Sequence, residues 1–216
     1  EMTKEYTVIA LSALDSLRRI VGPEDLILDE SALEAYSLDA LGRWESGQPG
    51  LSPPRVYAAV RPSSTEEVAQ VVRFAHHERM PLVPYGGGTG VMGAVTPLQG
   101  GIAVDLKKMN RVVKVDTQDR AATVEAGIVL GDLDTALSQN GLMLGHDPYS
   151  VPIATVGGAI STNGVGYRAA RHGPMADQGL GLEVVLPNGQ VLHTRAVPQA
   201  SAGPPLPTLS LAHRPR

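Results

Sequence analysis

The sequence predicts an α+β fold from three observations. Apolar residues recur at helical spacing within residues 8–21 and again after Ser64. Short apolar runs bounded by turn residues follow one another between residues 102 and 126, which is the pattern of β-strands. Pro187-Asn188-Gly189 separates two further apolar runs and is the clearest hairpin signal in the chain. A mixture of helices and short strands is therefore expected up to about residue 195.

The N-terminal half is expected to alternate helices with single strands. Ser64 and Glu67 have the spacing of a capping box, which predicts a helix start, and the apolar stripe that follows ends near Arg79. Ser31 is placed to cap a shorter helix. The expected elements are a helix at 8–21, a helix at 32–36, a loop at 42–54, a strand at 55–61, a helix from 63 to 79 and a strand at 81–85.

The C-terminal half is expected to contain shorter elements. Leu130, Leu133 and Leu137 mark a helix that Asn140-Gly141 ends. The last 21 residues hold five prolines and no acidic residue, and they are expected to be irregular. The other expected elements are strands at 102–106, 111–116 and 121–126, a turn at 146–150, a small-residue stretch at 154–166 and hairpin strands at 182–186 and 190–194.

The composition of the 216 residues excludes several classes of function. A net charge of −4 gives no basic surface for nucleic acid, and one Trp, six Tyr and one Phe are too few to stack single-stranded bases. Cysteine is absent, which excludes disulfides, thiolate metal sites and a cysteinyl cofactor link, and no other metal-ligand spacing is visible. No apolar run reaches the roughly 18 residues of a membrane span and no signal pattern is present, so we expect a cytoplasmic protein.

A glycine-rich segment follows the strand expected at 81–85. It reads Pro84-Tyr85-Gly86-Gly87-Gly88-Thr89-Gly90. Four glycines in five positions leave the backbone N–H groups unobstructed, so these groups can converge on a phosphate, and Thr89 can add a hydroxyl donor. A tight turn would also select glycine, but the density of glycines favours phosphate binding.

Two other phosphate-binding loops fit this segment poorly. Gly88, Gly90 and Gly93 match the dinucleotide fingerprint, but that fingerprint requires a helix that opens within the glycines. Val95-Thr96-Pro97 and then Gly100-Gly101 follow instead, and no helix fits there. A P-loop requires Gly-Lys-Ser/Thr, which the chain lacks.

A second segment, residues 146–164, is rich in small and hydroxyl-bearing side chains. Its short side chains would let a flat ligand lie against the backbone, and Thr155, Ser161 and Asn163 offer hydrogen bonds to such a ligand. The same residue types also pack a helix closely onto a sheet. This segment alone does not separate the two interpretations.

Together the two segments resemble the FAD-binding domain of the vanillyl-alcohol oxidase superfamily, also called the PCMH type. The pattern is similar to the FAD-linked oxidase branch, which includes the flavin-binding chain of glycolate oxidase as well as D-lactate dehydrogenase. The resemblance runs from about residue 53 to residue 203. It covers, in this order, RPSSTEEVAQVVRFA, PLVPYGGGTG, ATVEAGIVLGDLDTAL, HDPYSVPIATVGGAISTNGVG and GLEVVLPNGQVLHTR.

The resemblance implies a small N-terminal αβ lobe, a larger lobe of mixed sheet and helices, and FAD between them. The backbone of residues 86–90 would hold the FAD pyrophosphate. Relatives that bind flavin covalently use a histidine late in this loop, where this chain has Thr89, so the flavin is expected to be non-covalent. The implied cofactor-binding residues are Pro84, Tyr85, Gly86, Gly87, Gly88, Thr89, Gly90, Pro148, Ser150, Thr155, Gly157, Gly158, Ser161, Asn163, Gly164 and Val185.

The resemblance further implies an oxidoreductase that transfers hydride from a 2-hydroxy acid or similar alcohol to FAD and passes the electrons to an acceptor. It names no catalytic residue, because the family builds most of its substrate side from a further domain. His146 and His172 lie nearest the expected flavin path, but structural or surface roles are favoured for all six histidines. The alternatives are an FAD-binding subunit that relies on a partner chain, an inactive fragment and, more distantly, a nicotinamide-dependent Rossmann enzyme.

The resemblance also sets the expected domain limits. Residues 1–52 are expected to form an N-terminal helical extension, and residues 53–203 a PCMH-type domain that is incomplete at its C-terminal end. Residues 204–216 fit nothing in the family, and we hypothesise a frameshift or gene fragment near Pro204.

Overall fold

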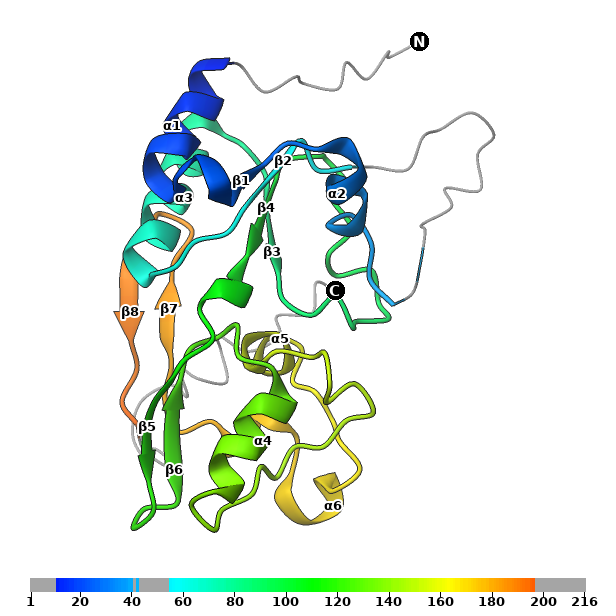
Figure 1. Cartoon of the computed structure of the whole chain (residues 1–216), viewed down its shortest axis with the longest axis vertical. Helices are drawn as coiled ribbons and strands as arrows, with labels where there is room; N and C mark the ends of the chain where they lie inside the picture. The colour runs from blue at the N-terminus through cyan, green and yellow to red at the C-terminus, as the bar shows by residue number, and fades with distance from the viewer. Residues whose placement is uncertain (1–10, 41, 43–54, 197–216) are drawn as a thin grey trace. The chain divides into compact units, whose positions relative to one another are not determined.

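The computed structural model describes residues 11–40, 42 and 55–196 (Figure 1). The chain divides into two compact units. Unit 1 comprises residues 1–106 and 187–189, and unit 2 comprises residues 107–186 and 190–216. The start of the first expected helix, most of the loop at 42–54 and the irregular tail lie outside the described residues.

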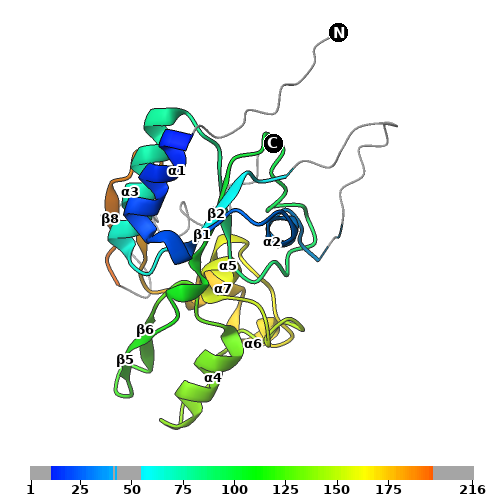
Figure 2. The same ribbon diagram turned by 45° about the horizontal axis from the view of Figure 1, so that its top comes forward.

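Unit 1 is built on a four-stranded sheet with the order β1-β2-β4-β3. The strands β2, β4 and β3 are parallel to one another, and β1 is antiparallel to β2. The α-helices α1 and α3 lie side by side in both ribbon views (Figures 1 and 2). The elements are α1 (Leu11–Val21), η1 (Pro23–Asp25), β1 (Leu26–Ile27), α2 (Glu30–Ala35), β2 (Ala58–Val60), α3 (Thr65–Glu78), β3 (Leu82–Tyr85) and β4 (Ile102–Asp105).

Alternation along the central strands gives this sheet two buried faces. Ala58 and Val60 of β2 pack in one cluster with Leu17 of α1 and Val71 of α3. Ala59 of β2 packs in a second cluster, whose other buried members are Leu33, Val56, Val83 and Ala103. Because successive strand residues point to opposite faces, α1 and α3 cover one face and α2 covers the other. Near-continuous apolar runs are the sequence pattern expected of strands buried in this way.

The predicted helix starts are confirmed for α3 and wrong for α2. Ser64 caps α3, and its hydroxyl accepts a hydrogen bond from the Glu67 N–H at 3.2 Å. The Glu67 carboxylate, however, accepts from the Ser63 N–H at 2.7 Å. The cap of α2 is Asp29 rather than Ser31, because the Asp29 carboxylate accepts from the Ala32 N–H at 2.9 Å. The Ser31 hydroxyl donates to that carboxylate instead.

Unit 2 contains two antiparallel hairpins and four short helices among its described residues. Its buried cluster includes Ile128, Leu130, Leu133, Leu137 and Met175, so the leucine stripe that predicts α4 does form the core. The two four-residue helices, α6 and α7, were not expected from the sequence. The elements are η2 (Leu106–Lys108, which begins on the last residue of unit 1), β5 (Val112–Asp116), β6 (Ala121–Val124), α4 (Leu130–Ser138), α5 (Val156–Ser161), α6 (Ala169–His172), α7 (Met175–Gln178), β7 (Glu183–Val185) and β8 (Val191–His193).

The tip of the β7–β8 hairpin, Pro187–Gly189, groups with unit 1. The Gly189 carbonyl accepts a hydrogen bond from Arg73 Nη1 on α3 at 3.1 Å. Gly189 has a φ of +78°, and a Cβ there would lie 2.2 Å from the Arg73 Cγ and 2.9 Å from the Ala69 carbonyl oxygen. Glycine is therefore required at this tip both by its conformation and by the close approach of α3.

His146 is the most buried histidine of unit 2, with 3% of its surface exposed. Its Nδ1 is buried and has no hydrogen-bond partner among the described residues. Burial lowers the pKa of His146 below its ordinary value, and the nearby Asp147 charge only partly opposes this effect. The folded chain therefore favours the neutral imidazole.

This burial predicts an acid-sensitive fold. The unfolded chain protonates His146 with a pKa of about 6.5, whereas the folded chain resists protonation, so the free energy of unfolding should fall as pH drops below about 6.5. The slope due to this one proton cannot exceed about 1.4 kcal/mol per pH unit. Urea unfolding at several pH values between 7.5 and 5.5 measures this slope of the free energy of unfolding.

The variant that tests this assignment is His146→Gln. His146→Gln should flatten the slope over the same range. An equal slope in wild type and His146→Gln would contradict the assignment.

Candidate functional site

The glycine-rich segment begins where β3 ends and contains a run of unpaired backbone donors. None of the N–H groups of residues 87–92 donates a hydrogen bond to another described residue. Residues 86–101 contain no helix, so the match to the dinucleotide fingerprint is accidental, as expected. Buried protein N–H groups are almost always paired, whereas residues 87–90 are half-buried and Val91 and Met92 are exposed, so this run is free to donate to a ligand or to water.

Tyr85 supports this loop. Its hydroxyl donates to the carbonyl of Ala35 at 3.1 Å and reaches that of Leu38 at 3.4 Å. Gly88 has a φ of +63°, and a Cβ there would lie 2.3 Å from the Tyr85 hydroxyl oxygen. Gly88 is therefore the position in the loop where glycine is required on both conformational and steric grounds. Burial raises the pKa of Tyr85, so its hydroxyl stays protonated.

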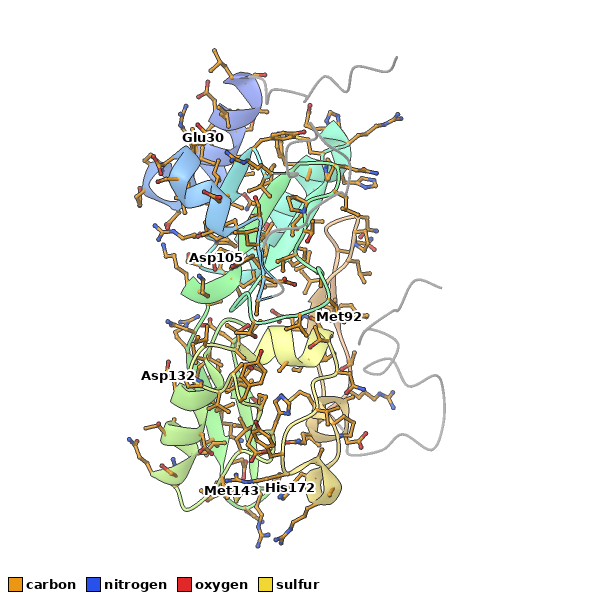
Figure 3. All side chains as sticks on the ribbon, turned by 90° about the vertical axis from the view of Figure 1, so that its right-hand side faces the viewer. Glu30, Met92, Asp105, Asp132, Met143 and His172 are labelled. Carbon is orange, nitrogen blue, oxygen red and sulfur yellow. The ribbon has the colours of Figure 1, made fainter. Side chains whose placement is uncertain are left out.

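A buried polar group beside Tyr85 was missed by sequence reasoning. Asp105, labelled in Figure 3, is the last residue of β4 and pairs with Tyr85 across the sheet. Its carboxylate accepts a hydrogen bond from the Tyr36 hydroxyl at 2.8 Å, and the rings of Tyr36 and Tyr85 meet edge to face at 5.1 Å. Burial, followed by the bond to Asp105, raises the pKa of Tyr36. A carboxylate at the end of an otherwise apolar strand was the signal available in the sequence.

Three of the polar side chains expected to bind the cofactor from unit 2 make hydrogen bonds within that unit. Thr155 caps α5, and its hydroxyl accepts from the Gly158 N–H at 3.3 Å. The Ser161 hydroxyl donates to the Gly157 carbonyl at 2.8 Å. The Asn163 side-chain oxygen accepts from the Ala176 N–H at 3.0 Å. These oxygens keep lone pairs for a ligand, but their first role is to shape the segment.

Close packing explains the small residues of the same segment. A Cβ on Gly157 would lie 2.9 Å from both the Cβ and the carbonyl oxygen of Ala126. A Cβ on Gly164 would lie 3.0 Å from the His146 Nε2. The packing interpretation that the sequence left open therefore holds for these glycines, and it is compatible with a ligand on their other side.

The remaining expected residues occupy turns and a strand. Pro148 and Ser150 lie in the turn before α5, where their carbonyls accept from the N–H groups of Val151 and Ile153. Val185 is the last residue of β7 and pairs with Val191. The set thus divides into Pro84–Gly90 in unit 1, and Pro148, Ser150, the α5 segment and Val185 in unit 2.

Neither a metal cluster nor a membrane-spanning helix occurs in the part of the chain that the structure describes. Within residues 11–40, 42 and 55–196, no three His, Asp or Glu side chains gather as metal ligands. No helix within these ranges has the length and apolar character needed to cross a membrane.

Comparison with known proteins connects these features to a family. Residues 56–195 match the model of the FAD binding domain family. The chain is 32% identical over 187 residues to glycolate oxidase subunit GlcD of Bacillus subtilis. The aligned region covers 87% of this chain and 38% of that protein. It is 37% identical over 181 residues to a probable mitochondrial D-lactate dehydrogenase of Danio rerio, covering 84% of this chain and 34% of that protein.

A solved structure shows the same fold. A structure of alkyldihydroxyacetonephosphate synthase aligns with a TM-score of 0.81 at 26% identity, covering 93% of this chain and 37% of that one. The chain thus spans about two-fifths or less of the length of these relatives. The family match extends over most of the chain and includes both segments singled out above, so this chain belongs to the FAD binding domain family.

Proposed function

We propose that this chain is the FAD-binding part of a flavin-dependent oxidoreductase that oxidises a 2-hydroxy acid or a similar alcohol. The printed names of the relatives support this substrate class, because glycolate and D-lactate are both 2-hydroxy acids. The proposal includes an electron acceptor, to which the reduced enzyme passes the electrons. The chain spans only part of each relative, so the reaction is assigned to the whole enzyme and FAD binding to this chain.

The observation that carries the proposal is the run of N–H groups at residues 87–92 that donate to no other described residue. The pyrophosphate of FAD is an anion that needs several hydrogen-bond donors, and a glycine-rich backbone provides them without side-chain obstruction. Hydrogen bonds to a charged acceptor contribute about 1.5–3 kcal/mol each, roughly twice the contribution of neutral ones. The loop therefore fits the phosphate part of FAD by its donors and by its shape at Gly88.

In this proposal the residues of the chain bind and orient the cofactor. Bound FAD supplies the redox chemistry by accepting a hydride from the substrate C–H bond. The backbone of residues 86–90 binds the pyrophosphate, and the Tyr85 hydroxyl fixes the loop through the Ala35 carbonyl. The other cofactor contacts proposed from the family resemblance are Pro148, Ser150, Thr155, Gly157, Gly158, Ser161, Asn163, Gly164 and, on the adenine side, Val185. No proton-abstracting residue is assigned within this chain.

We propose that the flavin is bound without a covalent link, because Thr89 occupies the loop position where some relatives of this superfamily carry the linking histidine. The purified chain should be yellow, and acid precipitation should release its flavin into the supernatant. Visible spectra of the supernatant and pellet measure this release. Flavin retained in the pellet would contradict the non-covalent assignment, and a folded chain that stays colourless with added FAD would contradict the proposed function.

We also propose a partner polypeptide. The relative from Bacillus subtilis is named a subunit, and this is the observation that favours an FAD-binding subunit over an independent enzyme. Co-purification of a second chain from the source cell, identified by mass spectrometry, would support this assignment.

The cytoplasmic location and the domain limits at residues 53 and 203 stay predictions.

Gly88→Ala should weaken FAD binding. Its Cβ would overlap the Tyr85 hydroxyl, and its positive φ costs an L-residue about 1–2 kcal/mol, so the loop must move. Each 1.4 kcal/mol corresponds to about tenfold in affinity, so we expect a loss of at least about tenfold in a flavin titration.

Gly141→Ala is the matched control for this variant. Gly141 also has a positive φ, +69°, but nothing lies within 4 Å of its Cβ position, and it follows α4 in unit 2. It should therefore reproduce the conformational strain without changing the FAD affinity. Equal affinities of Gly88→Ala and Gly141→Ala would argue against phosphate binding by the glycine loop.

A further inference from the structure

The far end of the glycine loop is fixed by a carboxylate that lies outside the loop. Asp39, four residues after the last residue of α2, accepts a hydrogen bond at its Oδ2 from the Gly93 N–H at 3.0 Å. Asp39 has 9% of its surface exposed, and its own carbonyl accepts from the Gly42 N–H at 2.9 Å. Both the backbone and the side chain of Asp39 are thus held in place.

The near end of the loop is fixed by the same segment of chain. The Tyr85 hydroxyl donates to the Ala35 carbonyl and lies 3.4 Å from the Leu38 carbonyl. Residues 35–39 therefore contact the chain at Tyr85, two residues before the first of these N–H groups, and at Gly93, directly after the last. A loop whose two ends are bound to one short segment has far fewer conformations than a loop fixed at one end.

We propose that Asp39 is a positioning residue for the cofactor pyrophosphate: it binds the Gly93 N–H and thereby holds residues 87–92 in the conformation in which their N–H groups converge on the anion. This inference rests on the proposed function. Asp39 acts through the loop and does not touch the cofactor.

The charge of Asp39 separates this role from a direct electrostatic one. A carboxylate close to an anion site repels the anion, so its negative charge cannot be what favours binding. What it contributes is an acceptor oxygen at the correct place for the Gly93 N–H. A neutral acceptor of the same shape should therefore perform the positioning as well, without the repulsion.

The test compares three substitutions at Asp39 with one elsewhere in unit 1. Asp39→Ala removes the acceptor, Asp39→Ser keeps a polar group that is too short to reach Gly93, and Asp39→Asn keeps an acceptor of the same length. Asp29→Ala is the matched control, because it also removes one carboxylate–amide bond next to α2 but has no contact with the loop. If Asp39→Ala does not fold, Asp39→Ser provides the same comparison.

Two readouts are needed. Hydrogen exchange of the free chain, followed by mass spectrometry on peptides that cover residues 86–93, reports the loop itself. Flavin titration of the full chain reports affinity for FAD. We expect Asp39→Ala and Asp39→Ser to speed exchange in the loop and to weaken FAD binding about tenfold, the effect of losing roughly 1.4 kcal/mol of preorganisation. Asp39→Asn should bind FAD as tightly as wild type or more tightly, and Asp29→Ala should leave both readouts unchanged.

The outcomes distinguish this inference from the proposed function. If the folded wild-type chain binds no FAD, the proposed function fails and the assignment of Asp39 fails with it. If wild type binds FAD and Asp39→Ala and Asp39→Ser bind it equally well, only the assignment is overturned. A loss of affinity in Asp39→Asn as large as in Asp39→Ala would also overturn it, because the acceptor would then not be what matters.

Discussion

A run of backbone N–H groups without protein acceptors can present a fixed surface to a ligand or to water only where the surrounding structure constrains the loop that carries them. In unit 1 that constraint is met by the parallel sheet, which delivers the chain at the end of β3, and by the segment after α2, which holds the loop on both sides. The proposed phosphate-binding surface is thus a property of backbone geometry. The side chains that matter most, Tyr85 and Asp39, matter because they fix that geometry.

The sequence was informative where a local signal and the tertiary structure agree. Ser64 caps α3, the Leu130 stripe packs into the unit 2 core, and Gly189 sits in the hairpin turn, each because a short-range preference coincides with a long-range contact. The sequence prediction failed at α2, because Asp29 lies two residues before Ser31 and its carboxylate is the stronger acceptor.

The candidate site also contains some residues that the sequence reveals and others that it does not. The glycine loop could be found from composition alone, since four glycines in five positions leave a stretch of backbone with almost no side chains. Asp39 and Tyr36 could not be found, because they act on residues about fifty or more positions away and no periodicity links them to the loop. In unit 2 the sequence could not separate ligand binding from close packing. The short side chains that would admit a flat ligand are also those that let α5 approach Ala126. Both interpretations therefore describe the same residues.

The docking of the 187–189 tip on α3 has a consequence for the order in which the chain can fold during synthesis. The hydrogen bond from Arg73 to Gly189 joins residues 116 positions apart, and the tip is part of unit 1 although all of unit 2 up to β7 is made before it. At ordinary rates of translation, residue 189 emerges on the order of ten seconds after residue 73. The sheet of unit 1 can assemble in that interval, but the surface of α3 around Ala69 and Arg73 stays bare until the hairpin arrives. The last step in completing the N-terminal unit is therefore supplied by the C-terminal part of the chain.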